Sequence, residues 1–263
     1  MSEPALPPPA VPPSAYDDAY YREACAGAEA WTRSGGREID PLYPWALRLA
    51  GLAAGETVLD VGCGRGELLV AAVEQGAARA IGVEYSPAAV ALARATVAAH
   101  GADDRAEVLQ ADARRLPLPG ASADLVTLLD VVEHLTPAEL ALALTEARRV
   151  LRPGGRVFVH TMPNRLIFTV TYRALRLATG LRWPADPRTE HERRMHVNEQ
   201  TRGGLERALR AAGFADARAW YGRWVREDVP GARFARALAR RPRSRALGAA
   251  DVWAVATTPA TRP

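Results

Sequence analysis

Two acidic residues and a histidine lie within five positions of one another near the middle of the chain. In the run 130–134, Asp130, Glu133 and His134 are spaced i, i+3 and i+4, so a helical turn would place them on one face. A carboxylate or an imidazole there could take a proton from an acceptor hydroxyl. With His196 as a later ligand, the same groups could hold Mg²⁺, Mn²⁺ or Zn²⁺. The segment therefore predicts acid–base or metal-assisted chemistry, with Asp130, Glu133 and His134 as the candidate catalytic residues.

A glycine-rich loop is the second candidate site. Residues 58–67 read VLDVGCGRGE, an aliphatic run followed by Gly62, Gly64 and Gly66. Glycine there allows a tight turn and lets a ligand lie against bare peptide. The spacing G-x-G-x-G differs from the G-x-G-x-x-G fingerprint of nicotinamide-binding loops. Asp60, just inside the strand, favours a positively charged ligand such as S-adenosylmethionine.

Alternating strands and helices must position these groups. Apolar runs predict strands that end near 61, 84, 110, 129, 161, 221 and 257, and helices over 67–75, 87–100, 137–150 and from 201 to about 212. The run 151–156, Leu-Arg-Pro-Gly-Gly-Arg, predicts a helix stop and a turn before the fifth strand. Strands separated by helices predict a parallel, doubly wound sheet.

Acidic residues also follow the second and third predicted strands. Glu84 lies 22 positions after Gly62 (84 − 62), close to the roughly 20-residue interval at which an acid reaches a ribose diol in a βαβ unit. Asp112 follows the third strand and is placed to accept a hydrogen bond from an adenine amino group. Both residues predict a nucleoside at the carboxyl ends of the strands.

With these motifs in this order, the chain resembles the class I S-adenosylmethionine-dependent methyltransferases. The segments that carry the resemblance are 58–67, 81–86, 110–113, 124–135 and 151–159. The resemblance implies an α/β, Rossmann-like, doubly wound sheet of seven strands, mostly parallel with an antiparallel last strand. It also implies that S-adenosyl-L-methionine is the cofactor and that its binding residues are Asp60, Gly62, Cys63, Gly64, Gly66, Glu84, Tyr85, Asp112, Ala113 and Asp130. In that assignment Glu84 binds the ribose and Tyr85 packs on the adenine.

The segment 130–134 is similar to the metal-assisted branch of this family, which includes small-RNA 2′-O-methyltransferases and ubiquinone-pathway O-methyltransferases. That branch has an acid, two residues, Glu-His and a later histidine, which implies a metal held by Asp130, Glu133, His134 and His196. Here the first acid is aspartate, shorter than the glutamate usual in the RNA enzymes. A Glu-His pair is also common in the family without metal, in which case His134 would be a base or a capping group.

Composition narrows the function classes. The chain has 263 residues, a formal charge of +4 and 34 basic residues, all of them arginine. The absence of lysine indicates a composition bias more than a basic face for nucleic acid, so a nucleic-acid partner is not expected. Two cysteines exclude a disulfide framework. Without a secretory leader or an apolar run of membrane-spanning length, we expect a cytoplasmic protein.

The expected organisation is a disordered, proline-rich tail over 1–14 and a single methyltransferase domain over 15–263. Within it, 15–50 forms an N-terminal helical lid, 164–199 an inserted lid and 222–250 an arginine-rich insertion. A basic amphipathic helix in the inserted lid would close a substrate pocket or, as the weaker alternative, touch a membrane surface.

The inserted lid has a distinctive pattern. Its apolar residues at helical spacing are Leu166, Val170, Leu177 and Leu181, and its basic residues include Arg165, Arg173, Arg176 and, further on, Arg193. The apolar set, with arginines on the other side, predicts a basic amphipathic helix. The arginines could clamp a pyrophosphate or a nucleotide-sugar.

Three functions follow from these features. The first is methylation of a small molecule, most simply at a hydroxyl of a sugar, an isoprenoid or a natural product. The second is RNA ribose 2′-O-methylation, and the third is a non-catalytic subunit that binds S-adenosylmethionine. The inserted lid and the single domain favour the first, whereas the basic pI of about 9.4 and the 130–134 pattern favour the second. The intact glycine loop and the 130–134 pattern argue against the third, and the oligomeric state stays open.

Overall fold

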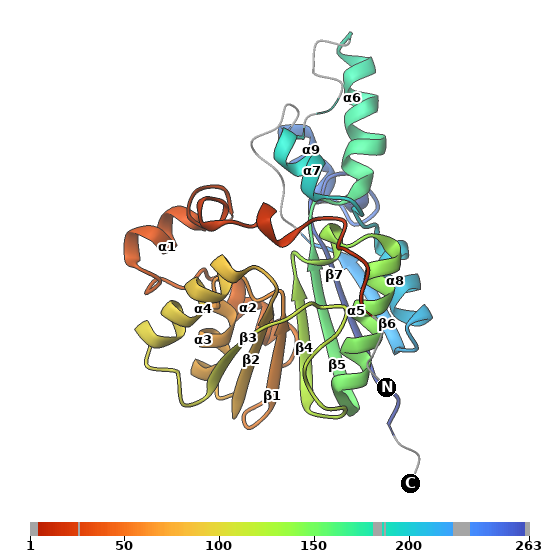
Figure 1. Cartoon of the computed structure of the whole chain (residues 1–263). Coiled ribbons are helices and arrows are strands. Elements are labelled where there is room, and N and C mark those ends of the chain that lie inside the picture. The colour runs from red at the N-terminus through yellow and green to blue at the C-terminus, as the bar shows by residue number, and fades with distance from the viewer. Residues whose placement is uncertain (1–4, 26, 181–185, 187, 223–231, 261–263) are drawn as a thin grey trace.

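The computed structural model describes residues 5–25, 27–180, 186, 188–222 and 232–260. Seven strands form one sheet in the order β3-β2-β1-β4-β5-β7-β6 (Figure 1). The pairs among β1 to β5 are parallel, and β7 runs antiparallel to both β5 and β6. The predicted doubly wound, mostly parallel sheet is confirmed. The last strand, β7, lies between β5 and β6 and is antiparallel to both of them.

The strands match the expected positions closely. They are β1 Thr57–Val61, β2 Arg79–Glu84, β3 Ala106–Gln110, β4 Ala123–Leu129, β5 Leu151–Thr161, β6 Ala215–Tyr221 and β7 Val252–Thr257. The helices are α1 Ala28–Ser34, α2 Leu42–Leu49, α3 Glu67–Glu74, α4 Pro87–Ala99, α5 Pro137–Val150, α6 Tyr172–Ala178, α7 Glu190–Met195, α8 Arg202–Ala211 and α9 Ala232–Ala239.

Helices cover both faces of the sheet because its central strands are apolar on both sides. Along β1, Val58 packs into a cluster with α2, α3 and α4, whereas Leu59 faces the cluster formed with α5 and α8. Both side chains are fully buried. Each such side chain contributes roughly 1.5–3 kcal/mol through apolar burial. These two layers hold the strand ends, and the loops beyond them, in fixed positions.

Capping residues fix where the helices begin. Ser86 caps α4 by accepting from the amide of Ala89, and Pro87 follows at the first helical position. Thr136, directly before Pro137, and Glu139 form a capping box at the start of α5. The predicted starts of these two helices are therefore confirmed, and each lies directly after a loop at the carboxyl edge of the sheet.

The predicted turn over 151–156 is wrong in part. Strand β5 begins at Leu151, paired with Ala123, and the ladder resumes where Leu125 pairs with Arg156. The residues between, including Pro153 and Gly154, form an irregularity inside the strand. A bulge accommodates a proline without breaking the sheet, because the bulged residues need no ladder hydrogen bond.

The prediction of a disordered tail over residues 1–14 is wrong for residues 5–14, which the structure describes. Residues 1–4 lie outside the described residues, but the segment 5–14 has defined partners. Val11 is buried, and the amide of Ala10 donates to Glu139 of α5 at 2.9 Å. Buried apolar contact and long-range hydrogen bonds are the features that a polar, aperiodic tail lacks. We call residues 9–16 the N-terminal strap.

The inserted segments form a cap above the carboxyl edge of the sheet (Figure 1). A π-helical turn over Ile167–Thr171 leads into α6. Of the apolar residues in the predicted pattern, Val170 and Leu177 are exposed, Leu166 is half-buried and Leu181 lies outside the described residues, whereas Phe168, outside the pattern, is buried. The π-turn changes the residue period and rotates the buried face. No helix in the described part of the chain has the length and hydropathy needed to span a bilayer.

Candidate functional site

A cavity of about 360 Å³ lies at the carboxyl ends of the parallel strands. Loops after β1, β2, β3 and β4 contribute to its walls, and the N-terminal strap closes one side. Parallel α/β sheets bind ligands at this edge, where the loops diverge. The predicted site residues that line it are Asp60, Gly62, Cys63, Gly64, Glu84, Tyr85, Asp112, Ala113, Asp130, Glu133, His134 and His196.

The end of β1 brings a buried carboxyl group to the cavity. Asp60 is almost fully buried and accepts a hydrogen bond from Thr127 Oγ1 at 2.6 Å. Burial raises its pKa to about 7. Gly62 follows with a φ of +78°, and a Cβ there would lie 2.5 Å from Val131 Cγ2, so only glycine fits. Gly66 lies outside the lining and packs instead against Ala93 of α4.

Glu84, at the end of β2, is held rigidly by the backbone. Its carboxyl group accepts from the amides of Gly64 at 3.1 Å, Tyr85 at 2.8 Å and Ser86 at 2.9 Å. Burial nevertheless raises its pKa above the ordinary value. Three donors occupy three of about four acceptor positions on a carboxylate, which leaves one for a ligand hydroxyl.

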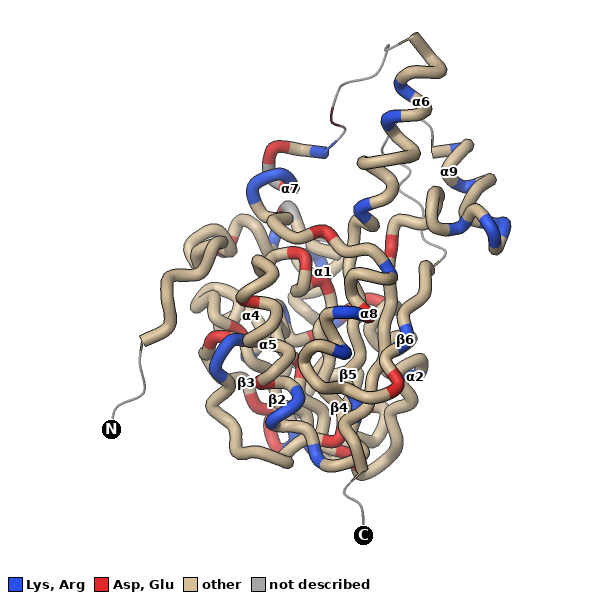
Figure 2. Tube along the Cα trace, turned by 90° about the vertical axis from the view of Figure 1, so that its right-hand side faces the viewer, with Lys and Arg blue, Asp and Glu red and all other residues tan. Residues whose placement is uncertain are grey.

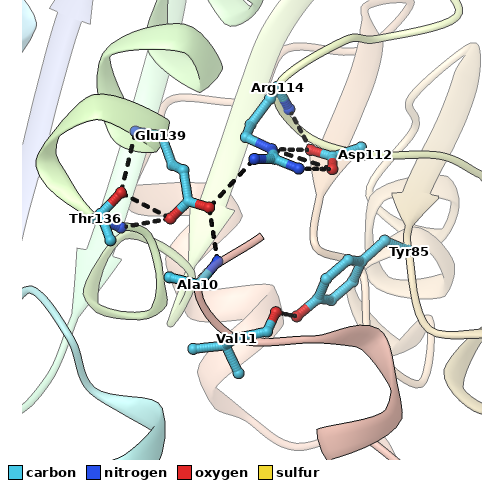
Figure 3. A network of polar contacts seen from close by, with 7 residues as sticks. All are labelled: Ala10, Val11, Tyr85, Asp112, Arg114, Thr136 and Glu139. Atoms are coloured by element: carbon cyan, nitrogen blue, oxygen red, sulfur yellow. Dashed lines mark hydrogen bonds and ion pairs between the residues drawn. The ribbon is translucent and has the colours of Figure 1, made fainter. Parts of the chain in front are cut away.

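A polar network joins the β3 loop, α5 and the N-terminal strap (Figure 3). Arg114 donates to Asp112 at 2.8 Å and to Glu139 at 3.2 Å. Tyr85 Oη donates to the carbonyl of Val11 at 3.1 Å. Burial opposes ionisation of Asp112, but Arg114 outweighs it and lowers the pKa of that carboxyl. Asp112 is therefore a fixed carboxylate partly satisfied by Arg114, a partner that the sequence reasoning missed.

The structure separates Asp130 from the other two members of the 130–134 run. Asp130 has a φ of +55°, and the 3₁₀ turn Val132–His134 begins after it. Its Oδ1 lies 2.9 Å from His160 Nδ1, an ion-pair distance, on the strand paired beside it. Burial opposes ionisation of Asp130, but His160 outweighs it and lowers the pKa of Asp130. Burial likewise opposes the charge on His160, but Asp130 raises the pKa of that imidazole. Both shifts favour the charged forms of the two groups over the neutral ones.

Glu133, His134 and His196 come together as expected. Their ligand atoms all lie within 4.8 Å of one another, and the rings of the two histidines are 4.9 Å apart. Asp130 is not part of this set, so the predicted four-residue arrangement reduces to three. Glu133 accepts from Thr161 Oγ1 at 2.8 Å, and burial followed by Asp130 raises its pKa to about 8.

Aromatic residues of the N-terminal segment complete the cavity. Tyr16, Tyr20 and Tyr21 line it, and the ring of Tyr16 lies 5.6 Å from that of His134 and 5.5 Å from that of Tyr85. The cluster of tyrosines was the sequence signal for this wall. Val11 gave no such signal, since it stands among prolines.

Comparison with known proteins identifies the part of the chain that builds these walls. Residues 58–155 match the family described as methyltransferase domain. They are a class I S-adenosylmethionine-dependent methyltransferase domain. The match covers the glycine loop, Glu84, Asp112 and the 130–134 run, so the methyltransferase domain contains most of the cavity wall.

Curated proteins that resemble this chain are themselves named as methyltransferases. A protein of Mycolicibacterium smegmatis named "probable S-adenosylmethionine-dependent methyltransferase" is 37% identical over 64% of this chain and 55% of its own length. A ubiquinone biosynthesis O-methyltransferase of Pseudomonas paraeruginosa is 35% identical over 51% of this chain and 57% of its own. The chain thus spans about half the length of these curated relatives.

Among solved structures, an S-adenosylmethionine-dependent methyltransferase from Mesorhizobium loti superposes with a TM-score of 0.58. The overlap covers 84% of this chain and all of that one, at 21% identity. At this identity the match shows the shared fold.

The cavity of the methyltransferase domain fits the family's cofactor. A buried carboxyl with a raised pKa, Asp60, would gain from a cation beside it, and S-adenosylmethionine carries a sulfonium and an ammonium. Glu84 keeps an acceptor position for a ribose hydroxyl. The bare backbone at Gly62 and Gly64 admits close approach of a ligand.

Proposed function

We propose that this protein transfers a methyl group from S-adenosylmethionine to a hydroxyl oxygen of a small molecule, with His134 as the base. When bound, the cofactor supplies a methyl group on a positively charged sulfur. The ubiquinone-pathway relative, an O-methyltransferase by name, supports an oxygen acceptor. The 2′-hydroxyl of RNA and a non-catalytic binding role remain the alternatives to be tested.

The observation that carries the proposal is the orientation of His134. Its Nδ1 lies 3.1 Å from the carbonyl oxygen of Met195, at the end of α7. A carbonyl can only accept, so Nδ1 carries the proton and Nε2 carries the lone pair. The amide of Asn198 donates to the carbonyl of Glu133 at 2.9 Å and fixes the same segment over the turn. His134 is thus held in the tautomer that can accept a proton from a hydroxyl.

A divalent ion is the second arrangement that the geometry supports. Glu133, His134 and His196 would hold it, and it would lower the pKa of a bound hydroxyl. Two imidazoles with one carboxylate suit Mn²⁺ or Zn²⁺ better than Mg²⁺, which prefers oxygen ligands. In that case His134 would be a ligand and another group would take the proton.

The test combines cofactor binding with turnover. Calorimetric titration with S-adenosylhomocysteine on metal-stripped protein, with and without Mn²⁺, measures the cofactor site and any metal dependence. Replacing His134 by Gln is expected to lower methyl transfer to a panel of hydroxylated small molecules by about 10²–10⁴-fold. The affinity for S-adenosylhomocysteine should stay within about twofold, because His134 is a base in this scheme and not a cofactor anchor.

His100→Gln is the matched control, since His100 bonds the carbonyl of Gly36 outside the cavity lining. It should leave turnover unchanged. No binding of S-adenosylhomocysteine would reject the proposed function. Methylation of RNA but of none of the small molecules would favour the RNA alternative.

A further inference from the structure

A second cavity, of about 600 Å³, lies beside the first. The inserted segment forms most of its wall, together with Pro137 at the start of α5. His196 lines both cavities, so the two meet at the residue that faces His134. The proposed function uses only the first cavity. A ligand in the second would have one end near the histidine pair.

Two arginines face this second cavity from the inserted segment. Arg165 just before the π-turn, Thr169 within it and Arg173 on α6 all line the cavity. Both arginines are exposed. Arg165 interacts electrostatically with Glu199 in the same wall, but neither arginine lies within ion-pair distance of an acid among the described residues. Figure 2 shows blue segments along α6 and around the neighbouring α7. Two guanidinium groups are thus available to a ligand.

Arg188 in the same wall has a different role. It donates to Asp186 at 2.7 Å and to Glu199 at 2.6 Å, and its guanidinium stacks 5.5 Å from the ring of Phe168. These contacts join the residues before α7 to Glu199 after it and to Phe168 of the π-turn. Three arginines against two acids leave the described lining with a net charge of +1 (3 − 2), with His196 neutral. Because Arg188 forms ion pairs with both acids, Asp186 and Glu199, the excess positive charge of the lining lies at Arg165 and Arg173.

We propose that the second cavity binds a phosphate or diphosphate group of the methyl acceptor through Arg165 and Arg173. This inference rests on the proposed function and names its substrate class. Guanidinium groups match phosphate oxygens in bidentate geometry, and two of them suit a group that carries more than one negative charge. Held there, the acceptor would extend toward His196 and present its hydroxyl to His134.

The experiment titrates inorganic pyrophosphate into the full chain by calorimetry, with and without saturating S-adenosylhomocysteine. Pyrophosphate is expected to bind, and to bind in both conditions, because the two ligands occupy separate cavities. The Arg165→Gln/Arg173→Gln double variant should weaken pyrophosphate binding by about 100-fold, with each charge-assisted contact contributing about 10-fold. Arg48→Gln on α2 is the matched control for the loss of a charge, and it should change binding by less than about twofold.

S-adenosylhomocysteine titrated into the same variants separates this inference from the proposed function. Normal cofactor binding without pyrophosphate binding would overturn the inference and leave the function standing. Competition between the two ligands would also overturn it, since the anion would then lie in the first cavity. Binding to phosphatidylglycerol vesicles that the double variant loses, without binding of free pyrophosphate, would assign the arginines to a lipid surface instead.

Discussion

Among single residues, Asp60 links cofactor recognition to stability. Its folded pKa, about 7, lies above the ordinary aspartate value of 3.8, so the folded state binds the proton more tightly than the unfolded chain. Stability from this group is therefore complete below about pH 4 and is lost as the pH rises through 7. The difference between the folded and unfolded pKa of Asp60 corresponds to about 4 kcal/mol of the free energy of unfolding as an upper limit.

Asp60→Asn should therefore stabilise the ligand-free protein at pH 8 and leave its stability nearly unchanged at pH 4, where Asp60 is already neutral. The amide keeps an oxygen for the Thr127 hydroxyl but cannot carry a charge. The same variant should weaken S-adenosylhomocysteine binding, because the cavity loses an anion that would balance the ligand's positive charge. Thermal melts and titrations at the two pH values measure both effects. Equal melting temperatures for the two proteins at pH 8 would contradict the assignment of a buried, ionising Asp60.

Asp130 shows where residue-level prediction from the sequence ends. All three residues of the pattern Asp130, Glu133 and His134 line the cavity, but the helical turn that the spacing assumed does not include Asp130. A left-handed φ of +55° turns Asp130 toward His160. That contact depends on the register in which Leu129 pairs with His160, thirty-one positions later (160 − 129). Spacing along one segment carries no information on such a cross-strand partner.

Among the elements, the N-terminal strap is the one most open to a direct test. It closes the cofactor cavity with Val11 and Tyr16, and its hydrogen bond from Tyr85 spans 74 positions of the chain. Tyr85→Phe keeps the ring and removes this bond. We expect S-adenosylhomocysteine to dissociate about 2- to 10-fold faster, since a typical hydrogen bond contributes about 0.5–1.5 kcal/mol.

Stopped-flow fluorescence measures this dissociation rate. Tyr221→Phe, on β6 and outside the cavity lining, is the control and should leave the rate unchanged. Removal of residues 1–15 should speed dissociation further than Tyr85→Phe, because the apolar contact of Val11 is lost as well. An unchanged rate after that truncation would show that the strap does not retain the ligand.

Elements of the core were predictable and the additions to it were not. Hydrophobic periodicity, the residues typical of turns, and prolines at helix starts predicted the positions of β1 to β4, α3, α4 and α5 to within a few residues. The strap was missed because its order comes from tertiary contacts, such as the bond between Ala10 and Glu139, and not from local pattern. The buried face of the insertion was missed because a π-turn breaks the 3.6-residue period on which the prediction depended.

In the molecule as a whole, the two edges of the sheet have separate roles. The carboxyl edge holds the cavities and the buried acids Asp60, Glu84 and Glu133, whose pKa values are raised by burial. Ion pairs lie at both edges: Arg114 pairs with Asp112 and Glu139 at the carboxyl edge, and Arg156 pairs with Glu56 at the amino edge. Glu56, just before β1, accepts from Arg156 Nη1 at 2.8 Å and Nη2 at 2.7 Å. Burying the acids of the cavity lowers the free energy of unfolding. Ion pairs such as Glu56–Arg156, far from the cavity, offset part of that loss.

Glu56→Gln tests this division of the molecule. The bidentate hydrogen bond with Arg156 lowers the pKa of Glu56 below its ordinary value of 4.5. Ionised Glu56 therefore stabilises the folded state fully above about pH 4.5, and this contribution is lost as the pH falls through the lower folded pKa. Both side chains are about one-fifth exposed, so the loss at pH 7 should be only about 1 kcal/mol, or about 2–4 °C in Tm. The difference from wild type should vanish in acid. Affinity for S-adenosylhomocysteine should not change, because Glu56 lies at the far edge of the sheet from the cavity. A variant that lost affinity as well as stability would show that the two edges are coupled through β1.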